Sequence, residues 1–488
     1  MQVLIVLSVL GALAVADNAV QEPATHAVTK GVLALFVCAL PILWAWAWTR
    51  VAVRDLRRPD VDRGRALSKQ RWVRRAHLVL WLAAAGFVLL ALDWPRIVRF
   101  NMGLDGWVLI DELLVSLPVL VPLVLSWAAY HDVDRVLHES VAGPNRDGQL
   151  AADTLLPPRW NCVAFQARTV MGVALAPLLL LLLTQDIARL LAPGFMAGPD
   201  AWMVLLLPLL MLVVGFPVLL RHVWRTSPLP PGPLRTRLEM AARRFNLHVR
   251  EILVWRTNGL LLNAAVAGFV PGLRYVFLTD SLLEQLNDDE IEAVFGHEVG
   301  HIRHRHVFLR ALVLLAPICL WPLLQGSLDL FAPSAESLGA AHWTAAIAAG
   351  LALLFLLGLY IAAVFGYCSR RFERQADLFG CRVSSAGQAG RDANAAVPAS
   401  GLSPAGIQTF IGALEKLALL NGVSRHAPSW QHGSIDMRVG FLEGVEHDPT
   451  RERGCHRQVR ILGGVLVSAV LVGLIAPLLL NAVQAAGF

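Results

Sequence analysis

Long apolar runs alternate with polar, arginine-rich segments along the whole chain. A helix needs about 20 apolar residues to cross a bilayer, so runs of roughly that length predict membrane spans. Eight such runs are present, at 31–49, 77–94, 107–129, 170–192, 201–220, 311–326, 343–367 and 461–483. Residues 1–16 form a shorter apolar run. Two interpretations of this run stay open, a cleaved signal-like segment and a short span. The pattern predicts a mainly α-helical protein that crosses the membrane many times.

Two polar segments between the spans are long enough to fold outside the lipid. In the first, four prolines between 228 and 233 break the preceding helix, and an amphipathic helix is followed by strand-like runs at 251–257, 261–269 and 273–280. The predicted organisation is an N-terminal apolar segment and outer loop (1–30), a five-span region (31–220), a first polar segment (221–306), a two-span region (307–367), a second polar segment (368–460) and a C-terminal span (461–488).

The distribution of basic residues predicts the orientation, because basic flanks are retained on the cytoplasmic side during insertion. Ten Arg and Lys residues lie between positions 50 and 75. The segments 95–106, 193–200 and 327–342 contain only Arg96 and Arg99. Counting spans from the basic loop places both long polar segments in the cytoplasm.

Composition agrees with a membrane protein, since 56% of the residues are hydrophobic and the mean hydropathy is +0.56. The net charge of +6 fits the basic cytoplasmic loops. No interleaving of basic and aromatic residues stands out, so nucleic acid is not an expected partner. Only three of the 42 basic residues are lysine. This bias is typical of a GC-rich genome and favours a bacterial inner membrane.

The most specific chemical signal is the H-E-x-x-H motif at 297–301. Asn287 and Glu290 are spaced as a capping box, which predicts a helix that begins there and carries the motif. Positions i and i+4 of a helix share one face, so His297 and His301 can hold one Zn²⁺. Glu298 is then placed beside the attacking water as general base. The motif predicts a zinc peptidase.

A catalytic zinc needs a third protein ligand and an open position. A metzincin would have glycine at 304 and histidine at 307, where this chain has His304 and Val307, so that class is excluded. The run Leu104-Asp105-Gly106 is similar to the aspartate motif of site-2-type membrane proteases. It precedes the zinc helix, however, and is predicted on the opposite face of the membrane.

A better source of the ligand follows two spans after the motif. There the chain is predicted to return to the same side of the membrane with an E-x-x-x-D pair, Glu373 and Asp377, on one face of a helix. Glu373 is the predicted third ligand, and Asp377 is predicted to accept the free ring N–H of His297. One Zn²⁺ per chain is therefore expected.

Between about 250 and 440 the chain resembles the integral-membrane gluzincin family that contains the type I CAAX prenyl proteases and the stress protease HtpX. The matching segments are Asn263-Ala264, 276–283, 297–301, 369–377 and 432–438. The resemblance implies a mainly α, multi-pass transmembrane helical protein with a small α+β gluzincin-like zinc peptidase domain on the cytoplasmic side. His432-Gly433-Ser434 departs from the family's His-Pro-Ser or His-Pro-Thr, which leaves the local turn open.

The resemblance also implies roles for four further residues. Asn263 and Ala264 would bind the substrate main chain along an edge strand. His432 would stabilise the tetrahedral oxyanion as a catalytic residue. Arg438, counted with the substrate-binding residues, would orient or neutralise nearby carboxylates. Without the family, Asn263 is a typical turn residue, His432 a loop residue and Arg438 a solvated charge.

The expected function is zinc-dependent cleavage of membrane-associated or misfolded polypeptides, similar to HtpX quality control, at the bilayer surface. Processing of prenylated CAAX-type proteins is one alternative. A noncatalytic membrane scaffold that retains a zinc site is another.

Two further pairs of residues, one pair of histidines and one pair of acids, have no assigned role. For His304 and His306, a polar helix end near the lipid headgroups is favoured over an auxiliary metal pair. Asp111 and Glu112, in the third predicted span, either line a hydrated cavity or lie at the outer membrane surface.

Overall fold

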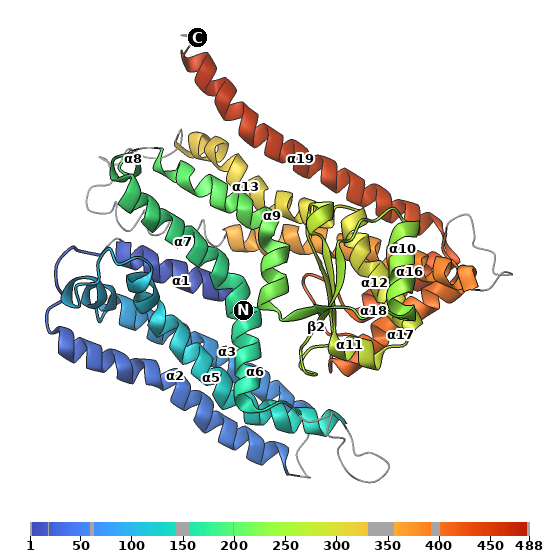
Figure 1. Ribbon diagram of the computed structural model, residues 1–488, viewed down its shortest axis with the longest axis horizontal. Coiled ribbons are helices and arrows are strands. Elements are labelled where there is room, and N and C mark those ends of the chain that lie inside the picture. Colours follow the sequence, from blue (N-terminus) through green and yellow to red (C-terminus); the bar gives the residue numbers. More distant parts are fainter. Residues whose placement is uncertain are drawn as a thin grey trace. The chain divides into compact units, whose positions relative to one another are not determined.

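The computed structural model describes residues 2–17, 19–58, 63–142, 156–198, 200–329, 356–391 and 401–485. The chain divides into two compact units. The first consists of Met1–Thr226 and Trp255–Leu261, and the second of Ser227–Val254 and Leu262–Phe488. Figure 1 shows both units and labels most of their helices and strand β2.

The first unit is a bundle of apolar helices. Its elements are α1 (Gln2–Asp17), α2 (Ala27–Leu56), α3 (Arg63–Leu90), α4 (Trp94–Arg96), η1 (Ile97–Asn101), α5 (Ile110–Ala142), α6 (Arg159–Gln166), η3 (Ala167–Gly172), α7 (Val173–Leu191), α8 (Pro193–Met196), η4 (Ala201–Leu205) and α9 (Leu206–Val223). Helix α2 packs against α3 and α5, and α1 packs against α5 and α7. The apolar run at 1–16 is thus a helix inside the bundle, with Ile5, Val9 and Leu13 buried.

Six helices of the described chain are long and apolar enough to span a membrane. They correspond to the first five predicted spans and to the last one, which confirms the multi-pass prediction. The predicted span 311–326 lies in α13 (His306–Asp329), which follows α12 (Asp288–Arg303) after a bend of 50°. Most of the predicted span 343–367 lies outside the described residues.

The two acids of the third predicted span lie in the first turn of α5, and both are buried. Arg99 Nε donates a hydrogen bond of 2.9 Å to Asp111 Oδ2, and Arg99 Nη1 lies 3.0 Å from Asp17 Oδ1. Asp111 therefore takes part in an ion-pair network that joins α1, η1 and α5.

A small four-stranded sheet has the strand order β1-β2-β4-β3. The strands are β1 (Thr226–Pro228), β2 (Glu251–Trp255), β3 (Ala264–Ala267) and β4 (Tyr275–Thr279). Strand β3 pairs antiparallel with β4, with Ala264 opposite Leu278 and Ala267 opposite Tyr275. All five side chains of β4 are buried. Because β3 ends the strand order, its other edge has no neighbouring strand among the described residues.

Helices complete the second unit. They are α10 (Pro233–Arg244), η5 (Pro271–Leu273), α11 (Asp280–Gln285), α12, α13, η7 (Ile361–Phe365), α16 (Gly366–Arg391), α17 (Pro404–Leu420), α18 (Ile435–His447) and α19 (Thr450–Ala485). Helices α12 and α16 pack along each other, and α13 packs along α19 (Figure 1). One core, which includes Leu238, Val276, Phe295 and Phe379, joins the sheet to α10, α12 and α16.

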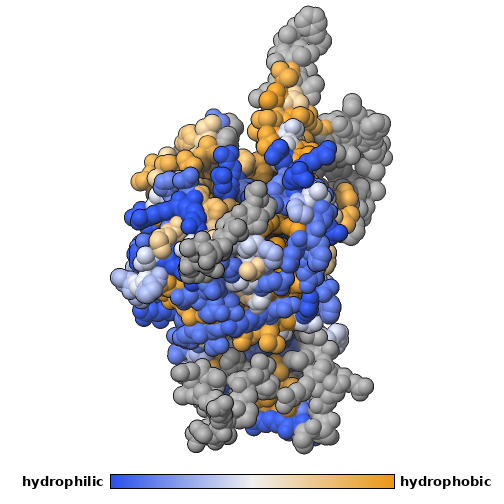
Figure 2. Space-filling view, turned by 90° about the vertical axis from the view of Figure 1, so that its right-hand side faces the viewer, coloured by the Kyte–Doolittle hydropathy of each residue, from blue (hydrophilic) through white to orange (hydrophobic). Residues whose placement is uncertain are grey.

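The surface of α19 changes character along its length. Beyond residue 460 many of its apolar side chains are exposed, including Ile461, Val465, Leu471 and Leu479, while Leu466 packs against α13. Figure 2 shows this apolar helix projecting above a largely hydrophilic face. Exposure of this kind is expected of a helix that faces lipid.

Candidate metal centre and substrate groove

The start of α12 is set by the capping box predicted from the sequence. Asn287 Oδ1 accepts a hydrogen bond from the backbone N of Glu290, and Glu290 Oε2 accepts one from the backbone N of Asn287, both at 2.9 Å. These bonds satisfy two amide groups that a helix end leaves unpaired. Because the helix begins there, His297 and His301 fall on its buried face.

Two glycines allow α16 to approach α12 closely. A Cβ atom at Gly296 would lie 2.7 Å from Val383 Cβ, and one at Gly300 would lie 3.0 Å from Phe379 Cβ. The first separation is shorter than carbon atoms tolerate, so the glycines are needed for this helix contact. The contact brings Glu373 of α16 next to the two histidines of α12.

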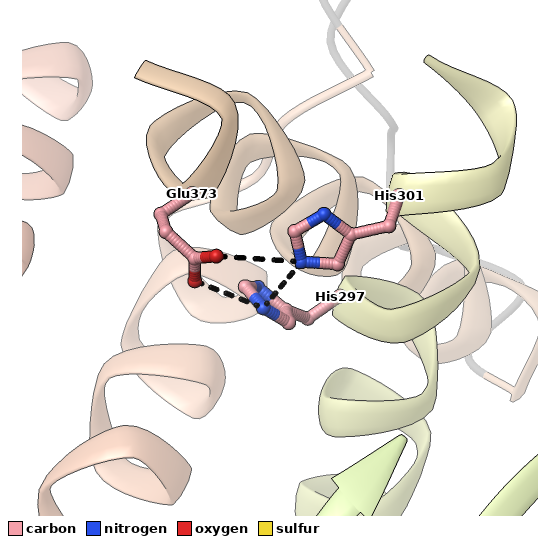
Figure 3. Close-up of side chains that lie close together, drawn as sticks. All are labelled: His297, His301 and Glu373. Atoms are coloured by element: carbon pink, nitrogen blue, oxygen red, sulfur yellow. Dashed lines mark hydrogen bonds and ion pairs between the residues drawn. The ribbon is translucent and has the colours of Figure 1, made fainter. Parts of the chain in front are cut away.

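His297, His301 and Glu373 point toward one another (Figure 3). The two Nε2 atoms are 3.3 Å apart, and they lie 3.6 and 3.7 Å from the carboxylate oxygens of Glu373. A tetrahedral Zn²⁺ with bonds of about 2.0–2.2 Å separates its ligand atoms by about 3.3–3.6 Å. Two imidazoles and one carboxylate are also a typical catalytic zinc set. The side chains therefore fit the ion.

Behind this cluster, Asp377 lies between His297 and Arg438. Its Oδ1 is 2.9 Å from His297 Nδ1, and Arg438 donates to both carboxylate oxygens, at 2.9 and 2.5 Å. All three side chains are almost completely buried. Asp377 thus has the predicted place beside the ring of His297. Arg438 is placed where it neutralises this carboxylate.

Burial and neighbouring charges shift the acids of the site in opposite directions. Burial raises the pKa of Glu298 to about 7. Burial also opposes the charge of Glu373, but its contacts with His297 and His432 hold the pKa of that carboxyl well below its usual range. A carboxylate that stays charged suits a metal ligand, whereas one with a pKa near 7 suits proton transfer at neutral pH.

A groove of about 610 Å³ opens beside the three side chains. One wall is the free edge of β3 with the residues before it, including Asn263, Ala264 and Ala265. Glu298 and His432 also line it. The groove is also lined by the apolar residues Val294, Phe410, Leu414, Leu417, Ala418 and Val423. A strand edge in a groove with apolar lining is suited to an extended peptide.

His432 comes to the cluster from a loop just before α18. Its Nδ1 lies 3.1 Å from Glu373 Oε2, while its side chain stays 55% exposed. Gly433 has a φ of 75°, and Ser434 caps α18 by accepting a hydrogen bond from the backbone N of Met437. Proline is restricted to a φ of about −65°, so a proline at position 433 could not adopt this conformation.

The sequence reasoning missed two contacts with the cluster. Arg310 Nη2 donates a hydrogen bond of 2.9 Å to Glu373 Oε1. His306 is fully buried, and its Nδ1 lies 2.9 Å from His301 Nδ1. His306 is thus the first residue of α13 and is buried in the protein, while its predicted position near the headgroups stays a prediction. Its contacts were missed because they depend on the packing of α12, α13 and α16, and the sequence showed only a polar residue at the start of an apolar run.

Several known proteins that are similar to this chain are named as proteases. Residues 228–427 match the model of Peptidase family M48. A "Protease HtpX homolog" of Aeropyrum pernix is 36% identical over 123 residues, 24% of this chain and 38% of the relative. A "CAAX prenyl protease 1 homolog" of Arabidopsis thaliana is 31% identical over 197 residues, 38% of this chain and 45% of the relative. The chain thus spans less than half the length of these relatives, and the predicted resemblance is confirmed.

The fold has a counterpart among solved structures. The crystal structure of S. mikatae Ste24p is similar with a TM-score of 0.50 at 15% sequence identity, and the similarity covers 86% of this chain and 99% of that one. The likeness extends beyond the matched peptidase region and agrees with a mainly α, multi-pass fold that carries a small sheet.

Proposed function

We propose that this chain, whose residues 228–427 match Peptidase family M48, is a membrane-embedded zinc endopeptidase that cleaves membrane-associated or misfolded proteins. The observation that carries the proposal is the groove in which the free edge of β3 runs beside the His297, His301 and Glu373 cluster. The groove presents a strand edge for the peptide main chain, and the cluster presents the ligands for a catalytic ion.

Zn²⁺ held by His297, His301 and Glu373 would acidify a water molecule and polarise the scissile carbonyl group. Glu298 accepts a proton from the attacking water at its carboxylate and later transfers it to the leaving amine. The pKa of about 7 suits both directions of this transfer. Asp377, with Arg438 behind it, holds the ring of His297 in one orientation.

His432 stabilises the charge that develops on the carbonyl oxygen. His432 Nδ1 lies 3.1 Å from Glu373 Oε2, and its other ring nitrogen, Nε2, would donate to the oxyanion. Its 55% exposed side chain lies on the groove, where it can reach a substrate. Asn263 and Ala264 hold the peptide main chain against β3.

The substrate class is tested by comparing the membrane proteomes of cells that produce the parent protein or Glu298→Gln. Quality control predicts that many unrelated membrane proteins accumulate with the variant. CAAX-type processing, which the similarity to Ste24p and the prenyl proteases keeps as the second candidate, predicts accumulation of unprocessed prenylated proteins only. If neither class changes, the noncatalytic scaffold becomes the better explanation.

The assigned roles of Asn263 and His432 predict different kinetic effects. Asn263→Ala removes a contact with the peptide main chain and should raise KM more than it lowers kcat. His432→Ala removes an oxyanion donor and should lower kcat by about 10²–10³-fold. Casein hydrolysis in detergent, with zinc content measured in parallel, checks both. Asn263→Asp is the matched second variant, since it keeps the shape of the side chain and loses only the amide group that donates. Loss of zinc from either variant would contradict these roles.

Orientation in the membrane requires new cysteines, because the native thiols at 162, 368, 381 and 455 are buried. Ser424→Cys lies in an exposed loop of the predicted cytoplasmic side, and Met102→Cys lies in an exposed loop of the predicted outer side. In intact cells, an impermeant maleimide should label only Met102→Cys. Ser424→Cys should react once the inner membrane is opened. Labelling of Ser424→Cys from outside would overturn the orientation.

A further inference from the structure

A continuous row of polar contacts leads away from the proposed zinc ligand His301. His301 Nδ1 lies 2.9 Å from His306 Nδ1, and His306 Nε2 lies 2.9 Å from Gln375 Oε1. Gln375 Nε2 lies 2.6 Å from His456 Nδ1, and His456 Nε2 lies 3.7 Å from Glu452 Oε1. The row therefore crosses from α12 through α13 and α16 to α19.

If His301 binds zinc, the donor and the acceptor of each hydrogen bond in this row can be assigned in only one way. A neutral imidazole that binds the ion through Nε2 carries its proton on Nδ1. His306 must then accept at Nδ1 and donate from Nε2 to the carbonyl oxygen of Gln375. The amide nitrogen of Gln375 donates in turn to His456 Nδ1, which leaves the Nε2–H of His456 facing Glu452. Each of the three hydrogen bonds from His301 to His456 then pairs a donor with an acceptor, and the 3.7 Å between His456 Nε2 and Glu452 Oε1 is an ion-pair distance.

The ring of His306 is also held by packing. It stacks on Phe372 with ring centroids 4.9 Å apart and planes at 15°, and its other neighbour His304 stacks at 5.6 Å and 25°. Its side chain is completely buried, and Gln375 is 5% exposed. A ring held by stacking and bonded at both nitrogens has one orientation available, so it can fix the ring of His301.

The far end of the row belongs to a helix outside the matched peptidase region, which ends at residue 427. His456 and Glu452 lie in the first turns of α19, and Glu452 is buried and paired with Arg382 of α16. Cys455 and Val459 of the same helix are buried as well. The start of α19 is thus packed into the second unit, while many of its later apolar side chains are exposed.

We propose that His306 is a positioning residue for the zinc ligand His301, and that Gln375 and His456 connect it to α19. The inference rests on the proposed zinc site. It gives the C-terminal helix a second task besides membrane anchoring, because its first turns support the metal centre. Outer hydrogen-bond partners of metal-binding histidines typically contribute about 10–100-fold to metal affinity.

The test measures Zn²⁺ affinity of the full-length protein by chelator competition, together with the visible spectrum of its Co²⁺ form. His306→Leu should weaken Zn²⁺ binding by about 10–100-fold and alter the Co²⁺ spectrum. His306→Asn places an acceptor near the position of Nδ1 and should recover part of the affinity. His456→Ala should cause a smaller loss than His306→Leu. His304→Phe is the matched control, because it keeps the stacked ring and should bind Zn²⁺ like the parent.

Parent-like affinity and spectrum in His306→Leu would overturn the inference and leave the zinc site standing. Loss of the folded state in the metal-free forms of both His306 variants would also overturn it, because His306 would then support the fold and not the ligand. Metal-free thermal melting measures this. A parent protein that binds no zinc would instead refute the proposed function.

Discussion

Replacing Glu298 with glutamine is expected to lower kcat for peptide hydrolysis strongly and to leave the zinc content unchanged. Glu298 lines the groove next to His297, but it is not one of the three converging metal ligands. Its amide replacement keeps the size of the side chain and cannot accept the proton of the attacking water. General acid–base catalysis contributes about 10²–10⁴-fold, so kcat should fall by that factor.

The measurement is casein hydrolysis by purified protein in detergent, with zinc determined on the same samples. Glu443→Gln is the matched control, since it makes the same chemical change on an exposed face of α18 and should leave kcat unchanged. If Glu298→Gln retains the activity of the parent, Glu298 is not the general base. A loss of zinc with the activity would show instead that Glu298 supports the metal.

Replacing Glu373 with alanine is expected to remove zinc from the purified protein. Its two oxygens lie 3.6 and 3.7 Å from the histidine nitrogens, and the substitution leaves two ligands where catalytic sites use three. Arg310 also loses its carboxylate partner and then adds an unpaired positive charge beside the site. The parent should hold about one Zn²⁺ per chain.

The Zn²⁺ affinity of Asp377→Asn, measured beside that of Glu373→Ala, tells whether a residue is a zinc ligand or a hydrogen-bond partner of a ligand. Asp377 contacts the ring of His297 from behind, so its replacement should weaken zinc binding by about 10–100-fold. Glu373→Ala should weaken it further. Titration with Zn²⁺ that is buffered over a range of free concentrations measures the separate affinities of the two variants. Equal affinity of Glu373→Ala and the parent would refute the assignment of Glu373 as third ligand.

Local patterns in the sequence were sufficient to predict the main elements and the residues of the candidate metal cluster. The capping residues Asn287 and Glu290 and the spacing of His297 and His301 depend only on helix geometry, which a sequence expresses directly. Glu373 was found because the same geometry links it to Asp377 and because span counting placed both on the side of the zinc helix. The structure brings these residues together as that reasoning expected.

These local patterns could not predict contacts between segments that are distant in the sequence. His306 opens an apolar run, and its sequence neighbours suggested a headgroup position. Its burial follows from the bend after α12 and from Phe372 and Gln375 of α16, which are more than 60 residues away. Arg310 was missed for the same reason, because its partner Glu373 lies on another helix.

The sequence by itself determined a membrane protein with many spans, a polar segment that resembles a zinc peptidase, and a helix with two candidate metal ligands on one face. These features depend on hydrophobic length and on helical periodicity, both of which are local. The tertiary structure decided how closely α16 approaches α12 across Gly296 and Gly300, and how α19 reaches the row of contacts behind His301. Such contacts depend on the packing of side chains from separate helices, and no local pattern encodes which surfaces will meet.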